Sequence, residues 1–131
     1  MNSLSEKVIG AAIEVHRILG PGLLEHSYEK ALGHELDLRG ISYKTQVVLP
    51  INYKDFEIPD AYRIDLLIEE QLIIEIKAVE NVLPVHKAQL LTYLRHTNKP
   101  LGLLINFNSS LLKNGLTRLI NKTQNKNSAN L

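Results

Sequence analysis

Hydrophobic and polar positions follow helical spacing in the first third of the chain. Apolar residues recur every three or four positions from Leu4 to Leu19, and again from about Leu24 to Leu38. Gly20-Pro21-Gly22 ends the first segment and Gly40 ends the second. Glycine accepts the left-handed conformation that follows a helix, and proline cannot continue one. The pattern therefore predicts two helices at the start of the chain.

The middle of the chain has strand-length apolar runs. Ser42–Tyr53 is enriched in β-branched and aromatic residues, and Pro50 within it favours an edge strand or a bulge. Arg63–Val79 contains two runs rich in Ile and Leu, separated by the polar residues Glu69-Glu70-Gln71. Two such runs around a short polar break are typical of a β-hairpin.

One more helix and one more strand complete the predicted fold. Val85–Thr97 has a helical pattern, and Pro100–Phe107 is almost wholly apolar, as in a strand covered on both faces. Leu111–Ile120 is expected to be a short helix or an irregular closing segment. The order αα-βββ-α-β describes an α/β domain with a central mixed sheet of about four strands flanked by helices. We expect residues 1–120 to form this single domain, and the polar residues 121–131 to be a disordered tail.

Two acidic residues of the hairpin lie opposite each other if its turn has three residues. With the turn centred on Glu70, Asp65 pairs with Glu75 and their Cβ atoms are roughly 5 Å apart, whereas a two-residue turn places them on opposite faces. Lys77 shares the face of Glu75. Facing carboxylates destabilise a sheet unless a cation, such as a divalent metal, compensates them. Spacing alone favours the simpler interpretation, a solvated polar face.

Composition narrows the classes of function. The net charge of +1 leaves no overall basic surface for nucleic acid, so any such patch must be local. The absence of cysteine excludes disulfides and thiolate metal sites. No apolar run of membrane-spanning length and no signal-like N-terminus is present. We therefore expect a cytoplasmic protein that does not associate with membranes.

Polar residues on the apolar sides of the predicted helices have two interpretations. Glu25 lies one turn before Tyr28, where an acid either interacts with the helix dipole or points to a buried polar site. On the later helix, Gln89 and Tyr93 share one side with His86. A packed aromatic residue with a polar neighbour, and a histidine in the first helical turn, are the simple explanations there.

The arrangement of these residues resembles a known family. Asp65, followed after a hairpin by Glu75-Ile76-Lys77, a helix and an apolar strand, resembles the PD-(D/E)xK nuclease core. Within that superfamily, Gly22–Tyr28 is similar to the signature of the GxxExxY family. The resemblance extends from about Leu4 to Phe107 and includes His16 before Leu19–Gly22, the segment Glu75–Val79 and the segment His86–Leu94. Ile64, where many members have proline, departs from the motif.

The resemblance implies a nuclease site that uses Mg²⁺, with Mn²⁺ as a substitute. Asp65, Glu75, Glu25 and the backbone carbonyl of Ile76 would hold the metal, and Lys77 would orient or activate the attacking water. Further residues would support the site or touch nucleic acid. These are Gln89 and Tyr93, which resemble the Gln-x-x-x-Tyr element of RecB-like members, and also Tyr28, His16 and His86.

Two functions of different classes follow. The first is a metal-dependent nuclease in repair, recombination or defence, acting on DNA in preference to RNA; the intact Asp65, Glu75 and Lys77 favour it. The second is a non-catalytic module that binds nucleic acid or a protein partner. The near-neutral charge and the lack of a predicted extra DNA-binding domain favour the second, or an enzyme that works in a homodimer or larger complex. A hydrolase of small phosphate esters would be a third, but no Gly-rich phosphate loop is present.

Overall fold

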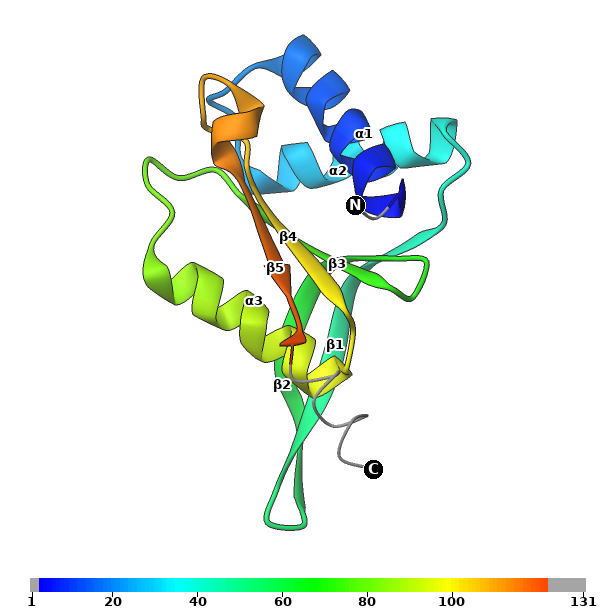
Figure 1. The fold of residues 1–131 in the computed structure, drawn as a ribbon, viewed down its shortest axis with the longest axis vertical. Coiled ribbons are helices and arrows are strands. Elements are labelled where there is room, and N and C mark those ends of the chain that lie inside the picture. Colours follow the sequence, from blue (N-terminus) through cyan, green and yellow to red (C-terminus); the bar gives the residue numbers. More distant parts are fainter. Residues whose placement is uncertain (1–2, 123–131) are drawn as a thin grey trace.

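A mixed β-sheet with helices on both faces makes up the part of the chain described by the computed structural model, residues 3–122 (Figure 1). In this range there are three α-helices, five strands and one short 3₁₀ helix. The elements are α1 (Ser3–Leu19), α2 (Glu25–Leu38), β1 (Tyr43–Tyr53), β2 (Phe56–Ile68), β3 (Leu72–Lys77), α3 (Pro84–Thr97), β4 (Leu101–Asn106), the 3₁₀ helix (Leu112–Gly115) and β5 (Leu116–Ile120).

The sheet has the strand order β1-β2-β3-β4-β5. Strands β3 and β4 are parallel and are connected through α3, and all other neighbours are antiparallel. As Pro50 predicts, β1 is an edge strand, and its pairing with β2 shifts between Leu49 and Ile51. The connected ends of β1 and β2 form a hairpin that projects from the rest of the described residues, at the bottom of Figure 1.

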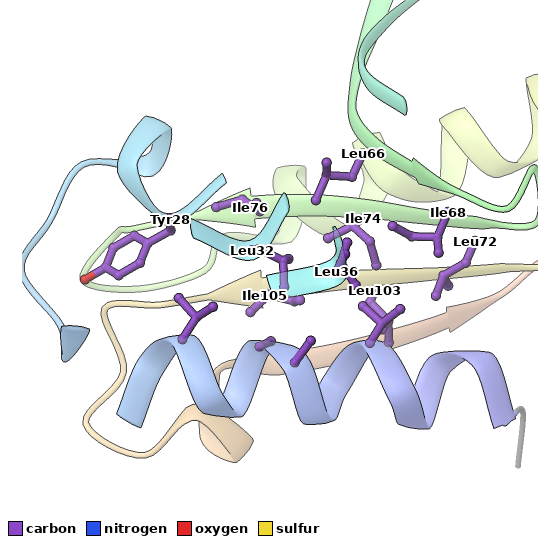
Figure 2. Close-up of a cluster of buried hydrophobic side chains, with 14 of the residues drawn as sticks. Tyr28, Leu32, Leu36, Leu66, Ile68, Leu72, Ile74, Ile76, Leu103 and Ile105 are labelled. Atoms are coloured by element: carbon purple, nitrogen blue, oxygen red, sulfur yellow. The ribbon is translucent and has the colours of Figure 1, made fainter. Parts of the chain in front are cut away.

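Two hydrophobic clusters fasten the helices to opposite faces of the sheet. The alternation of side chains along β3 sends Ile74 and Ile76 to one face and Ile73 to the other. Helices α1 and α2 cover the first face, and Figure 2 shows Leu32 and Leu36 of α2 beside Ile74 there. Helix α3 covers the second face through residues that include Leu90, Tyr93 and Leu94. Both faces of β3 and β4 are therefore buried, which explains their apolar sequences.

The hairpin between β2 and β3 has the predicted three-residue turn. Leu66 pairs with Ile74 and Ile68 pairs with Leu72, so the residue numbers of each pair sum to 140, as the numbers of Asp65 and Glu75 also do. Glu69 and Glu70 in the turn have φ of 48° and 60°, the left-handed region that favours glycine. The turn is thus formed without glycine, and it sets the register that brings Asp65 to Glu75.

The segment after β4 differs from the expectation. Leu111–Ile120 forms the 3₁₀ helix and then β5, a fifth strand that pairs antiparallel with β4. Asn121 is also part of the folded body and not of a tail. It is 3% exposed, and its side-chain amide donates to the backbone carbonyls of Leu94 at 3.0 Å and Lys99 at 3.1 Å. Residues 123–131 of the predicted tail lie outside the described residues.

No helix within residues 3–122 is long and apolar enough to cross a membrane.

Candidate active site

Strand β2 changes face at Asp65. Leu66 packs into the cluster under α1 and α2, whereas Ile64 packs into the cluster under α3, although residues two apart in a regular strand share a face. On β1, opposite this point, Gln46 has a left-handed φ of 51°. The ladder between β2 and β3 ends at the Leu66–Ile74 pair. The two strands therefore separate at Asp65.

The side chains of Asp65 and Glu75 occupy the point where the strands separate. The backbone N–H of Asp65 donates to Oε1 of Glu75 at 3.2 Å, and the backbone N–H of Ile76 donates to Oδ2 of Asp65 at 2.8 Å. Each carboxylate thus accepts a hydrogen bond from a backbone N–H of the opposite strand. These bonds lie beyond the last backbone pair of the two strands. This reciprocal pair fixes both carboxylates side by side, because a backbone N–H cannot move independently of its strand.

Burial keeps both acids from ionising easily, and the charge of Asp65 adds to this effect at Glu75. Glu75 is only 6% exposed, and its burial, followed by the charge of Asp65, raises its pKa to about 8. The hydrogen bond from Asp65 and the charge of Lys77 oppose this rise. Burial likewise raises the pKa of Asp65, against the hydrogen bonds from Ile76 and Gln46. A cation bound to the pair would lower both pKa values, since it favours the ionised forms.

The start of α2 and the end of β4 fix the backbone that follows β3. Oε2 of Glu25 accepts a hydrogen bond from the Ala78 N–H at 3.3 Å, and its charge raises the pKa of Asp65 and of Glu75. The buried Asn106 binds both backbone groups of Val79, accepting from its N–H at 3.0 Å and donating to its carbonyl at 2.9 Å. These bonds hold the segment that begins with the half-buried Lys77.

Helix α3 brings Tyr93 to the same site and carries Gln89, one turn earlier, beside Tyr93. Burial raises the pKa of Tyr93 to about 12, and the charges of Glu75 and Asp65 add to this rise, so its phenol lies within their field. A hydrogen bond from Gln89 acts in the opposite direction. The ring of Tyr93 also stacks on that of Tyr62, with centroids 4.5 Å apart.

Three other predicted residues make their described contacts elsewhere. Tyr28 is fully buried; its hydroxyl donates to the Gly20 carbonyl at 2.6 Å, and its ring stacks on Phe107. Nε2 of His16 bonds to the backbone carbonyl of Ser109 at 2.7 Å. Nδ1 of His86 accepts from the backbone N–H of Leu83 at 3.0 Å, at the start of α3. These contacts stabilise the loops and the helix end around the site.

Glu29 and Gln46 belong to the site but are not found by the sequence analysis. Nε2 of Gln46 donates to Oε1 of Glu29 at 2.6 Å and to Oδ1 of Asp65 at 3.4 Å. Glu29 follows Glu25 by four residues, so both lie on one face of α2, and that spacing was the available signal. The sequence around Gln46 has no comparable spacing, because Gln46 meets Asp65 and Glu29 only through the fold.

The donor atoms fit a hard divalent cation. Carboxylate oxygens suit Mg²⁺, which proteins bind through one or two carboxylates together with water and substrate phosphate. Within residues 3–122, no three His, Cys, Asp or Glu side chains converge to hold a metal by themselves. The adjacent Asp65 and Glu75 therefore offer two carboxylates, a number with which proteins bind Mg²⁺.

The fold and this site together define a class of protein. A mixed sheet with helices on both faces, and paired acids followed by a lysine where two central strands separate, is the arrangement of a PD-(D/E)XK nuclease. A family model described as the PD-(D/E)XK nuclease superfamily matches residues 2–119. The chain therefore belongs to this superfamily. Comparisons with curated proteins and with solved structures found no match.

Proposed function

We propose that this protein is a metal-dependent nuclease of the GxxExxY type, which hydrolyses phosphodiester bonds of DNA in preference to RNA during repair, recombination or defence. The observation that carries the proposal is the reciprocal hydrogen bonding of Asp65 and Glu75, which holds the buried Glu75 carboxylate beside the half-buried Asp65 carboxylate. Such a pair is unfavourable in a binding module that holds no metal cation between the two acids.

In this proposal, Asp65 and Glu75 hold Mg²⁺, together with the backbone carbonyl of Ile76. Glu25 does not converge with the two acids among the described residues, and its role would be to fix the backbone at Ala78. A bound divalent ion neutralises charge on the phosphate and makes a bound water more acidic. Both carboxylates must be ionised to bind a cation, so metal binding has to overcome the raised pKa of Glu75. Metal affinity is therefore expected to rise with pH.

Lys77 is the proposed catalytic cation. It lies on β3 two residues after Glu75, and its charge lowers the pKa of both Glu75 and Asp65, so it is close to the pair. There its ammonium group would orient the attacking water and stabilise the negative charge that develops on the phosphate. Tyr93 lies within the field of the same carboxylates, and Gln89 hydrogen-bonds to Tyr93; the two side chains would support the site or contact the nucleic acid backbone.

The experiment is a cleavage assay on single-stranded DNA, duplex DNA and RNA, in Mg²⁺ and in EDTA. We expect cleavage in Mg²⁺ only, and a loss of about 10²-fold or more in Lys77→Ala, the range expected when a positioned catalytic group is removed. Lys87→Ala is the matched control, because Lys87 is an exposed lysine of α3. Cleavage that persists in Lys77→Ala would contradict the assignment of this lysine.

A second candidate function is a non-catalytic module that binds nucleic acid or a protein partner, including a second copy of the chain. The projecting β1–β2 hairpin favours it, since Tyr53 and Phe56 near its tip are 60% and 66% exposed. Absence of cleavage on all three substrates, together with a complex detected by gel shift or by sedimentation, would support this function instead.

A further inference from the structure

Gln46 connects the metal-site acid Asp65 to a buried acid on another element. Gln46 lies on β1 between two residues that pair with Leu66 and Ile64, so it faces Asp65 on β2. Its Nε2 lies 2.6 Å from Oε1 of Glu29 and 3.4 Å from Oδ1 of Asp65. Both neighbours are carboxylates, which accept hydrogen bonds when ionised, so the amide nitrogen and not the amide oxygen must face them.

The backbone of Gln46 is held in an unfavourable conformation. Its φ of 51° is in the left-handed region, which residues with a Cβ rarely adopt and which persists only where the surroundings enforce it. Glycine would adopt this conformation without steric cost. Glu69 and Glu70 have a similar φ in a turn, whereas Gln46 lies within strand β1, which supports a role for its amide.

Glu29 fixes the orientation of that amide. It lies on the face of α2 that also carries Glu25, and it is 9% exposed. Its bond to Gln46 is short, whereas the bond from Gln46 to Asp65 is at the long end of the range. Hydrogen bonds in active sites are often long before ligand binds and shorten in the complex.

We propose that Gln46, oriented by Glu29, is a positioning residue that keeps the Asp65 carboxylate turned toward the metal. Asp65 then has one donor on each oxygen, the Ile76 N–H on Oδ2 and the Gln46 amide on Oδ1, which fixes the plane of its carboxylate. Such partners of metal ligands commonly change metal affinity by 10–100-fold when they are removed. The inference rests on the proposed nuclease function, since it assumes that Asp65 is a metal ligand.

The test is Mn²⁺ binding by calorimetry, together with thermal unfolding, on the full chain. Gln46→Met and Gln46→Gly both remove the amide, and only the glycine variant also relieves the backbone strain. We expect both to bind Mn²⁺ about 10-fold more weakly than wild type, with the glycine variant unfolding at the higher temperature of the two. A purely structural role would make affinity follow stability, so the two variants would differ in affinity as well.

Two further variants complete the set. Glu29→Gln keeps an acceptor for the Gln46 amide and should stay within about threefold of wild type, whereas Glu29→Leu should lose affinity as the Gln46 variants do. Gln71→Met, at an exposed glutamine in the β2–β3 turn, is the matched control. Wild-type affinity in both Gln46 variants would overturn this inference and leave the nuclease proposal intact. Absence of Mn²⁺ binding in wild type would overturn both.

Discussion

The backbone N–H of Asp65 donates to the carboxylate of Glu75 at 3.2 Å, so the two acids are held together by the strands that carry them. The bond from the Ile76 N–H to Asp65 completes the exchange. Where β2 separates from β3, the two carboxylates therefore accept the backbone N–H groups in place of backbone carbonyls. The course of the two strands keeps the carboxylates close together. This arrangement and the residues around it lead to three predictions.

The first prediction concerns the dependence of stability on pH. Glu75 ionises at its ordinary value of 4.5 in the unfolded chain and at about 8 in the folded protein. Between these values the folded state holds a proton that the unfolded chain has released. The contribution of Glu75 to the free energy of unfolding is therefore fully present below about pH 4.5 and is lost as the pH rises through 8. Partial burial also raises the pKa of Asp65, so Asp65 acts in the same direction.

Urea unfolding of wild type and Glu75→Gln in EDTA, from pH 5 to pH 9, measures this effect. The amide cannot ionise, so the stability of the variant relative to wild type should increase with pH, by on the order of 2–4 kcal/mol across the range. Glu57→Gln, at an exposed acid of β2, is the control, and its free energy of unfolding should change with pH as that of wild type does. A constant difference between wild type and Glu75→Gln would show that Glu75 is not a buried titrating group.

The second prediction separates structural support from site chemistry at Tyr28. Its hydroxyl donates to the Gly20 carbonyl at 2.6 Å and accepts from the Leu23 N–H at 3.0 Å. Tyr28→Phe should lower the free energy of unfolding by about 1–3 kcal/mol, because it leaves these groups without the partner they have in the fold. Tyr53→Phe, at an exposed tyrosine, should change it little. Mn²⁺ affinity that falls with Tyr28→Phe while stability does not would instead assign the phenol to the site.

The third prediction concerns Asn106. Its side chain bonds to the N–H and the carbonyl of Val79, in the segment that follows Lys77. Asn106→Leu should lower the free energy of unfolding by about 1–3 kcal/mol and also reduce cleavage, since the two polar groups of Val79 lose their partner and the segment loses its anchor. Asn108→Leu, at an exposed neighbour, controls for a general effect of the substitution. Unfolding curves that superimpose for Asn106→Leu and wild type would contradict the anchoring role.

The sequence predicts most of the fold because its signals are local. The two N-terminal helices, the edge strand with Pro50, the hairpin and α3 all follow from periodicity and turn residues. The register at Asp65 follows from counting across a three-residue turn. Strand β5 is missed because Leu116–Ile120 is short and only partly buried, so its pattern is weak until β4 is in place beside it.

The candidate site is predictable where its residues share one hairpin or fall within a segment that resembles the family, as Tyr93 on α3 does. Asp65, Glu75 and Lys77 lie on one hairpin, so strand alternation and resemblance to a family are enough to group them. Glu29, Gln46 and Asn106 join them from α2, β1 and β4. The spacing of Glu29 from Glu25 places both on one face of α2, but the contacts of Glu29, Gln46 and Asn106 depend on the bend at Asp65 and on how α2 packs against the sheet. The same limit applies to Asn121, which is polar in sequence yet buried against two carbonyls.

The proposed metal site is best tested by a calorimetric titration with Mn²⁺ of wild type and Asp65→Ala, since this needs no knowledge of the substrate. We expect saturable binding to wild type at neutral pH, stronger at pH 8 than at pH 6, and no detectable binding to Asp65→Ala. An equally folded Asp65→Ala that binds Mn²⁺ as wild type does would show that the Asp65–Glu75 pair does not hold the metal.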